Sequence, residues 1–282
     1  MNIGIFDSGS GGLTVMRALD RALPKENFIY LGDHANAPYG DRSAEDIYAL
    51  TLRSVERLFQ NDCSLVILAC NTAAARALRR LQHTWLPTAY PGRRVLGVIV
   101  PVVEEVTGMR WVADQTPVAR PQTAAPVAVG VFATRQTVES GAFAGEIHKR
   151  AAHVEVWQQA CPDLVPLIED DAATSKVEAA VGGYVARLGQ QMHGRSPDVC
   201  ILGCTHYPLI EPLFRKALPA ATRILSQPEV TARSLVAYLD RHREFSFPSG
   251  GQRTFLTTGD PALASRIASR FYGRDVAFVA TA

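Results

Sequence analysis

The stretch Ile3-Gly4-Ile5-Phe6-Asp7-Ser8-Gly9-Ser10-Gly11-Gly12 lies near the start of this 282-residue chain. An apolar run without polar alternation, followed by a polar and glycine-rich turn, is typical of a buried parallel strand that leads into a helix. Further runs that predict buried strands are Phe28–Leu31, Leu65–Leu68, Val95–Val100, Ala128–Phe132, His153–Trp157, Val199–Leu202 and Thr254–Thr257. Because segments of helical length separate them, such as Ala73–Gln82 and Thr174–Met192, we predict an α/β fold with mainly parallel sheets flanked by helices.

A faint internal repeat is visible in the chain. Leu65-Val66-Ile67-Leu68-Ala69-Cys70-Asn71-Thr72 resembles Val199-Cys200-Ile201-Leu202-Gly203-Cys204-Thr205-His206. At a similar offset, Gly4-Ile5-Phe6-Asp7-Ser8 has a parallel in Gly130-Val131-Phe132-Ala133-Thr134. Repeats in the same order predict two related, pseudo-symmetric α/β lobes.

Composition excludes several classes of protein. The 29 Lys and Arg residues and 27 Asp and Glu residues leave a net charge of +2, which does not favour a nucleic-acid or membrane-surface partner. Five widely spaced cysteines in a chain of this size indicate reduced thiols rather than a disulfide framework, and their spacing matches no zinc site. The first residues have no basic segment and no long apolar run, so we expect no signal peptide, no membrane span and a cytoplasmic location.

Two segments break the alternation of strands and helices. Residues Gly108–Ala125 are rich in Pro, Thr and Gln without a clear period, and we predict an exposed loop insertion there. His242–Gln252 is predicted to be a second loop.

Polar residues gather where the predicted strands end. They form the groups Asp7–Gly12, Cys70-Asn71-Thr72, Thr134 to Thr137, and Cys204-Thr205-His206. In open parallel sheets ligands bind beyond the carboxyl ends of the strands, so these groups predict one functional site.

Cys70 and Cys204 are the candidate reactive thiols of this site. Each stands near a predicted helix N-terminus, whose dipole and free N–H groups lower a thiol pKa and suit the thiol to proton transfer. Asp7 ends a buried strand, where its charge can tune a nearby thiol, although it can also be a helix N-cap. His206 follows Cys204 by two residues and is a candidate acid–base partner. Tyr39 lies in a Pro/Gly turn that can either cover a ligand or serve only as a turn.

Two similar lobes, each with a thiol at a shared cleft, suggest one reaction. If the sulfurs face opposite sides of a substrate carbon, one removes a proton and the other delivers one, which inverts the carbon without cofactor or metal. The weakly acidic α-hydrogen requires donors for the developing enolate, and Asn71, Thr72 and Thr205 can supply them.

Motifs spanning nearly the whole chain resemble those of the glutamate racemases, in the cofactor-independent aspartate/glutamate racemase superfamily. The matching stretches are Gly4–Val15, Pro38-Tyr39-Gly40 with Arg42-Ser43, Ala69–Ala73, Ala160-Cys161-Pro162 through Val165–Glu169, Leu202–Leu209 and Thr258-Gly259-Asp260. The resemblance implies inversion between L- and D-glutamate, with Cys70 acting on the D-enantiomer and Cys204 on the L-enantiomer.

The same resemblance implies roles for the neighbouring residues. Asp7 would assist Cys70, and His206 would assist Cys204 with support from Glu169. The substrate site would be lined by Asp7, Ser8, Tyr39, Gly40, Asn71, Thr72, Thr134, Thr137, Thr205 and His206. It also implies a cytoplasmic homodimer that supplies D-glutamate for bacterial peptidoglycan. One lobe would comprise residues 1–97 together with 212–282, and the other residues 98–211.

Three other readings stay open at this point. Cys70 to Arg76 has the spacing of a thiol-phosphatase loop, but it lacks glycine and its three consecutive alanines favour a helix. A two-lobed amino-acid-binding protein would need no paired thiols. Within the superfamily, a racemase of another small amino acid such as aspartate, or of a hydantoin, is the nearest alternative.

Overall fold

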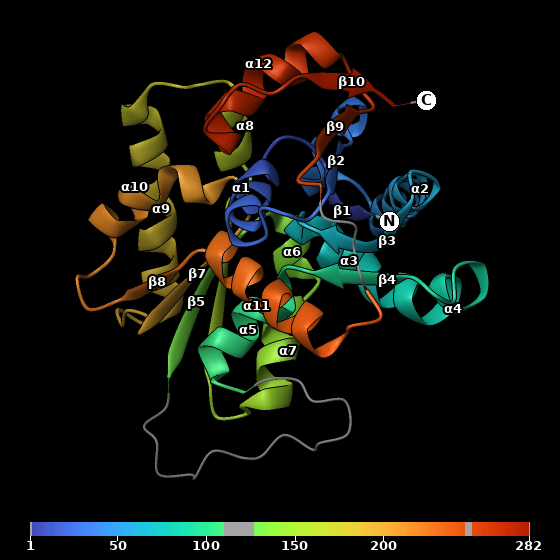
Figure 1. The fold of residues 1–282 in the computed structure, drawn as a ribbon. Coiled ribbons are helices and arrows are strands. Elements are labelled where there is room, and N and C mark those ends of the chain that lie inside the picture. Colours follow the sequence, from blue (N-terminus) through green and yellow to red (C-terminus); the bar gives the residue numbers. More distant parts are fainter. Residues whose placement is uncertain (1, 110–126, 246–249, 282) are drawn as a thin grey trace.

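The computed structural model describes residues 2–109, 127–245 and 250–281, and its strands form two parallel sheets (Figure 1). The strands are β1 (Asn2–Asp7), β2 (Phe28–Gly32), β3 (Cys63–Leu68), β4 (Arg94–Gly97), β5 (Ala128–Ala133), β6 (Glu155–Ala160), β7 (Val199–Gly203), β8 (Arg223–Leu225), β9 (Arg253–Thr257) and β10 (Phe278–Ala280). The first sheet has the order β10-β9-β2-β1-β3-β4 and the second β6-β5-β7-β8. Parallel sheets flanked by helices confirm the predicted α/β class.

The second sheet repeats the strand order of part of the first. The order β2-β1-β3-β4 of the first sheet corresponds, strand for strand, to β6-β5-β7-β8. In this correspondence β1 matches β5 and β3 matches β7, the same pairs that the internal sequence repeat aligns. Cys70 and Cys204 therefore follow equivalent strands.

Helices connect and cover the strands. They are α1 (Leu13–Ala22), α2 (Ala44–Gln60), α3 (Asn71–Arg80), α4 (Leu86–Ala89), α5 (Ile99–Thr107), α6 (Arg135–Glu139), α7 (Ala142–Arg150), α8 (Leu164–Glu169), α9 (Thr174–Gln191), α10 (Glu211–Ala217), α11 (Gln227–Arg241) and α12 (Pro261–Tyr272). Shorter helical segments are η1 (His34–Asn36), η2 (Tyr39–Asp41), the π-helical η3 (Leu81–Trp85) and η4 (Tyr207–Ile210). Covering both faces explains why the residues of β3, β5 and β7 are all buried.

Side-chain caps start the helices that border the functional site. Thr134 Oγ1 accepts a hydrogen bond from the N–H of Thr137 at the start of α6, at 3.3 Å. Cys70 Sγ accepts one from the N–H of Ala73 at the start of α3, at 3.5 Å. An N-cap oxygen or sulfur satisfies a helix N–H that lacks an intrahelical partner. The capping residues therefore have a local structural reason to stand at the strand ends.

Two predicted strands have different bounds in the structure. The run Val95–Val100 was predicted to be a strand throughout, but β4 ends at Gly97 and α5 begins at Ile99. Pro101 explains the change, because a proline in the first turn of a helix loses no intrahelical hydrogen bond. His153–Trp157 was predicted two residues too early, since β6 spans Glu155–Ala160.

The described residues allow only part of the predicted loops to be compared with the structure, and they do not test the predicted lobe boundaries. Most of the loop Gly108–Ala125 lies outside the described residues, and the described part of His242–Gln252 contains no helix or strand. The division into residues 1–97 with 212–282 and residues 98–211 stays a prediction. Because β8 pairs with β7, a lobe defined by its sheet would extend beyond residue 211 to include Arg223–Leu225.

Ion pairs and hydroxyl contacts connect elements of the two halves. Arg79 on α3 pairs with Glu146 on α7, which also binds Lys149 and Arg150.

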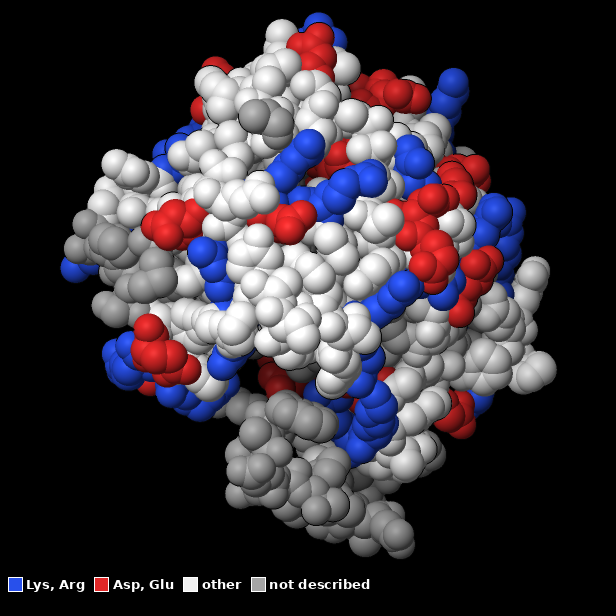
Figure 2. Space-filling view, turned by 90° about the vertical axis from the view of Figure 1, so that its right-hand side faces the viewer, with Lys and Arg blue, Asp and Glu red and all other residues white. Residues whose placement is uncertain are grey.

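Elsewhere, acidic and basic side chains are intermingled over much of the face in Figure 2, in keeping with the balanced charge. Within residues 2–109, 127–245 and 250–281, no helix is long and apolar enough to span a membrane.

Candidate active site

Residues that follow strands of both sheets line one small cavity. The cavity measures about 40 Å³ and is lined by Ser8, Pro38, Tyr39, Gly40, Asp41, Cys70, Asn71, Thr72, Thr134, Arg135, Pro162, Val165, Pro166, Cys204, Thr205 and His206. Ser8 follows β1, Cys70 follows β3, Thr134 follows β5 and Cys204 follows β7. The topology thus brings the predicted polar groups to a common site, as expected for the carboxyl ends of parallel strands.

Cys70 is a buried thiol between β3 and α3. Its Sγ lies 3.5 Å from Ser8 Oγ, to which it donates, and it is only 5% exposed. Burial, followed by the negative charge of Asp7, raises the pKa of Cys70 to about 12, although Ser8 and the N–H of Ala73 act in the opposite direction. The expectation that the helix N-terminus lowers this pKa is therefore wrong for Cys70, because desolvation outweighs one N–H contact. Cys70 is a neutral thiol at pH 7.

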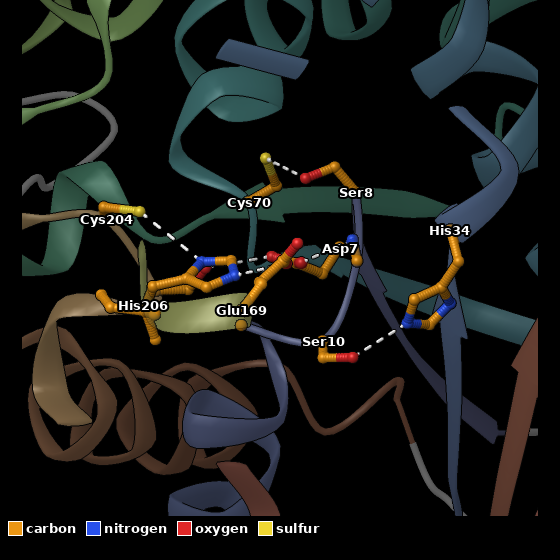
Figure 3. Close-up of polar contacts among 12 residues, drawn as sticks. Asp7, Ser8, Ser10, His34, Cys70, Glu169, Cys204 and His206 are labelled. Atoms are coloured by element: carbon orange, nitrogen blue, oxygen red, sulfur yellow. Dashed lines mark hydrogen bonds and ion pairs between the residues drawn. The ribbon is translucent and has the colours of Figure 1, made fainter. Parts of the chain in front are cut away.

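His206 lies between the second thiol and a carboxylate (Figure 3). Its Nδ1 is 3.7 Å from Cys204 Sγ, and its Nε2 is 2.8 Å from Glu169 Oε1. Burial by itself would lower the pKa of His206, but hydrogen bonds to Cys204 and Glu169 and their charges raise it to about 10. Burial likewise opposes the charged form of Glu169, yet His206 holds the pKa of this carboxyl below its usual value. An imidazolium thus bridges Cys204 and Glu169 at neutral pH.

Asp7 lies behind the cavity at the end of β1, fully buried. Its Oδ1 accepts a hydrogen bond from the N–H of Gly9 at 2.8 Å, and its Oδ2 accepts one from Thr205 Oγ1 at 3.2 Å. Burial raises the pKa of Asp7, while the charge of His206 and the N–H groups of Gly9 and Gly12 act in the opposite direction. Asp7 therefore connects the turn after β1 with the Cys204–His206 segment after β7.

Three threonine hydroxyls form a contact between α3 and α6. Thr72 Oγ1 lies 2.9 Å from Thr134 Oγ1, and Thr134 Oγ1 lies 3.0 Å from Thr137 Oγ1. The hydroxyl of Tyr39, which also lines the cavity, donates to Asp33 Oδ2 at 2.6 Å.

Most predicted site residues reach the cavity, and the rest contact those that do. Asp7, Glu169 and Thr137 do not line it, but they bind Thr205, His206 and Thr72, respectively. The sequence reading gave no role to the lining residues Pro38, Asp41, Arg135, Pro162, Val165 and Pro166. Four of these residues belong to motifs that carry the family resemblance, and this membership could have predicted their place at the site: Pro38, Pro162, Val165 and Pro166. The supporting residues Asp33, His34 and Gln227 had no such signal.

His34 illustrates a supporting contact at the glycine-rich turn. Its Nε2 lies 3.0 Å from Ser10 Oγ (Figure 3). Its Nδ1 lies 2.9 Å from Thr257 Oγ1 on β9. Burial lowers the pKa of His34. The turn after β1 is thus held by a histidine from the β2 end of the same sheet.

Gly11 allows the turn after β1 to approach His206 closely. A Cβ at this position would lie 2.4 Å from His206 Nδ1 and 2.5 Å from Thr205 Oγ1. We expect Gly11→Ala to displace the imidazole from Cys204 and to lower kcat/KM about 100-fold for the reaction that the sequence predicts, glutamate racemisation, since a misplacement near 1 Å has effects of that size. Coupled-enzyme kinetics, with circular dichroism to verify folding, measures this.

Gly182→Ala is the matched control for this substitution. Gly182 lies in α9, where an added Cβ meets no atom within 4 Å. Its activity should equal that of the wild type, with unchanged or slightly higher stability. A fully active Gly11→Ala variant would show that the position of His206 is unimportant.

The spacing of Cys70 and Arg76 does not form a phosphate-binding loop. Residues Asn71–Arg80 are the helix α3, and Arg76 Nη2 lies 3.7 Å from a carboxylate oxygen of Glu139. A helix cannot wrap its N–H groups around a phosphate as the phosphatase loop does. The thiol-phosphatase alternative is therefore set aside.

Comparison with known proteins identifies the family. The chain is 45% identical over 283 residues to the glutamate racemase of Phenylobacterium zucineum (strain HLK1), with 99% of each chain covered. Among solved structures, a glutamate racemase isoform of Bacillus anthracis matches with a TM-score of 0.83 at 31% identity, covering 100% of this chain and 97% of that one. The glutamate racemase of Francisella tularensis in complex with D-glutamate matches with a TM-score of 0.82 at 28% identity and the same coverage.

Two further findings complete the comparison. No protein-family model matches the chain. An aspartate racemase of Picrophilus torridus has a TM-score of 0.51 at 14% identity over 85% of this chain and 95% of that one, so it shares the fold alone and does not favour aspartate as the substrate. The full-length similarity to glutamate racemases shows that the chain belongs to the glutamate racemase family of isomerases.

Proposed function

We propose that this chain interconverts L- and D-glutamate by a two-base mechanism in which Cys70 and Cys204 serve opposite faces of Cα. The observation that carries the proposal is the pair of buried thiols at one cavity, each following the equivalent strand of a repeated sheet. A single base could return a proton only to the face from which it was taken. Two thiols from two sheets provide the second face.

The surroundings of the two thiols differ, and this difference supports one thiol as the acid and the other as the base. The pKa of Cys70 is raised to about 12, so its sulfur holds a proton and can act as an acid. Cys204 Sγ lies 3.7 Å from Nδ1 of the His206 imidazolium, so a positive charge stands beside this sulfur. We therefore assign Cys204 as the base for the L-enantiomer and Cys70 as the acid for the opposite face.

Conversion of L-glutamate begins when the Cys204 thiolate takes the α-proton. The Cα–H bond breaks, an S–H bond forms, and the electron pair moves toward the substrate carboxylate as an enolate. Cys70 then gives its proton to the other face of Cα and becomes a thiolate. After one turnover the protonation states are exchanged, which is the arrangement needed for D-glutamate.

Hydrogen-bond donors around the cavity would stabilise the enolate and hold the substrate. We assign this binding to Asp7, Ser8, Tyr39, Gly40, Asn71, Thr72, Thr134, Thr137, Thr205 and His206, most of which line the cavity. Asp7 would assist Cys70, since its charge acts on that thiol, and Glu169 would support His206. Preorganised donors in a closed site act strongly on a developing charge.

The wider biological role follows from the family. We propose that the product serves bacterial peptidoglycan as D-glutamate, and a relative crystallised in complex with D-glutamate supports that ligand. The homodimer and the cytoplasmic location stay predictions.

The test is incubation of the purified protein with L-glutamate in D2O without pyridoxal phosphate. We expect D-glutamate to form with deuterium at Cα, while L-glutamate recovered early in the reaction stays unlabelled, because acid and base are different groups. Chiral chromatography with mass spectrometry measures both pools. A protein that binds glutamate without any exchange at Cα would contradict the proposal, as would equal early labelling of both enantiomers.

A further inference from the structure

Two buried carboxamides face one another behind the cavity. Asn71 Nδ2 lies 2.5 Å from Gln227 Oε1, and Gln227 Nε2 lies 2.7 Å from Asn71 Oδ1. The pair is closed, because each side chain donates one hydrogen bond and accepts one. Asn71 is 2% exposed and Gln227 is fully buried.

The pair joins segments that are far apart in the chain. Asn71 is the first residue of α3, next to Cys70, whereas Gln227 is the first residue of α11. Asn71 lines the cavity and Gln227 does not. The side-chain hydrogen bonds of Gln227 go to Asn71, which makes Asn71 its direct link to the cavity.

A closed pair restricts what Asn71 can offer a substrate. A carboxamide has two N–H donors and one carbonyl oxygen. Gln227 engages the carbonyl and one N–H, and these two bonds together fix the plane of the amide. One N–H of Asn71 is left over, on a residue that lines the cavity.

We propose that Gln227 is a positioning residue, which holds the Asn71 carboxamide so that its remaining N–H faces the cavity and donates to a carboxylate oxygen of glutamate. The inference rests on the proposed function of the cavity. Without Gln227 the Asn71 amide can rotate and turn its carbonyl oxygen toward the substrate, which repels an anion. Gln227 thus contributes to the selection of a carboxylate substrate although it does not touch it.

Substitution of Gln227 should act on KM. We expect Gln227→Ala and the volume-conserving Gln227→Met to raise KM about tenfold, the equivalent of one hydrogen bond to a charged group. Because L- and D-glutamate have equal free energies in water, kcat/KM falls by the same factor in both directions. Gln82→Ala is the matched control, since Gln82 also donates a hydrogen bond, to Val95 O at 2.7 Å, but has no contact with Asn71.

Gln227→Glu gives a readout that a structural role alone would not change. A protonated carboxyl can replace both bonds of the amide, because it also donates once and accepts once. An ionised carboxylate cannot donate to Asn71 Oδ1 and repels it. The KM of this variant should approach the wild-type value at low pH and rise as the introduced carboxyl ionises, whereas the wild type lacks that step.

A double-mutant cycle decides whether Gln227 acts through Asn71. We measure KM and kcat with both enantiomers for the wild type, Asn71→Ala, Gln227→Ala and the double variant. If the inference holds, each single change raises KM about tenfold, and Gln227→Ala has less than a twofold effect in the Asn71→Ala background. The inference would be overturned if the two increases in KM multiplied in the double variant, or if Gln227→Ala had the KM of the wild type.

Two outcomes separate this inference from the proposed function. If the wild type does not racemise glutamate, the proposed function is refuted. If the wild type is active but the effects of the two substitutions on KM multiply in the double variant, only the role of Gln227 is refuted. If Gln227→Ala does not fold, the pH dependence of KM in Gln227→Glu and the KM of Gln227→Met decide the question. Lowered thermal stability with unchanged KM in these variants means that the pair is structural only, and also refutes the inference.

Discussion

Replacing either Cys70 or Cys204 by alanine is expected to lower the racemisation rate about a thousandfold. A positioned acid or base contributes about 10²- to 10⁴-fold to a proton transfer. No other group that lines the cavity stands in the place of either sulfur. Chiral chromatography of glutamate after long incubation measures the residual rate.

The two alanine variants should still differ in isotope exchange. Cys70→Ala retains the Cys204–His206 pair, so it can remove the α-proton of L-glutamate and return a deuteron to the same face. L-Glutamate should therefore gain deuterium in D2O without inversion, and D-glutamate should gain it in Cys204→Ala. Mass spectrometry of each enantiomer distinguishes these patterns.

Cys200→Ala is the control for thiol loss. Cys200 is a fully buried thiol on β7, where burial above all holds its pKa well above its ordinary value, and it does not line the cavity. We expect its activity to stay within a few-fold of the wild type. Full activity of Cys70→Ala or Cys204→Ala would disprove the two-base assignment.

His206→Asn should lower kcat/KM about 100-fold, because the variant loses the positive charge that lies beside Cys204 Sγ. Glu169→Gln should have a smaller effect, since it removes only the partner of His206 Nε2. The factor must be equal for both enantiomers, as the equilibrium constant between them is one. Initial rates in both directions at saturating and limiting substrate measure it.

The pH dependence of stability provides a second measurement for His206. Its pKa in the folded chain, about 10, lies above the ordinary value of 6.5. The charged form therefore stabilises the fold fully below about pH 6.5, and this contribution is lost as the pH rises through 10. The melting temperature of the wild type should fall between pH 7 and 10 more than that of His206→Asn. His153→Asn, at an exposed histidine, should follow the wild type, and parallel curves for wild type and His206→Asn would contradict the assignment.

The sequence predicts the central strands well because their burial is visible in their composition. Leu65–Leu68 and Val199–Leu202 have few polar residues, and both lie within fully buried strands. The edge strands β8 and β10 were missed, since three-residue segments with exposed positions carry little periodicity. Ile99 and Val100 favour a strand by composition, but Pro101 suits the first turn of a helix and α5 packs against α7 and α11.

At the candidate site, residues within sequence motifs were easier to predict than the residues that form hydrogen bonds from distant parts of the chain. Cys70, Cys204 and His206 follow predicted strands, so topology places each at the carboxyl end of its own sheet, and the two ends meet at the cavity. Gln227 reaches Asn71 across 156 positions, and Thr258 reaches Asp33 across 225, with a hydrogen bond of 2.6 Å. Such pairs depend on how the last part of the chain folds back beside β2 (Figure 1), which no local pattern reveals.

The size of the cavity has a consequence for the catalytic cycle. A space of about 40 Å³ is much smaller than an amino acid. Binding of glutamate, as proposed above, therefore requires the lining side chains to move apart. The rate of this movement sets an upper limit on the rate of racemisation.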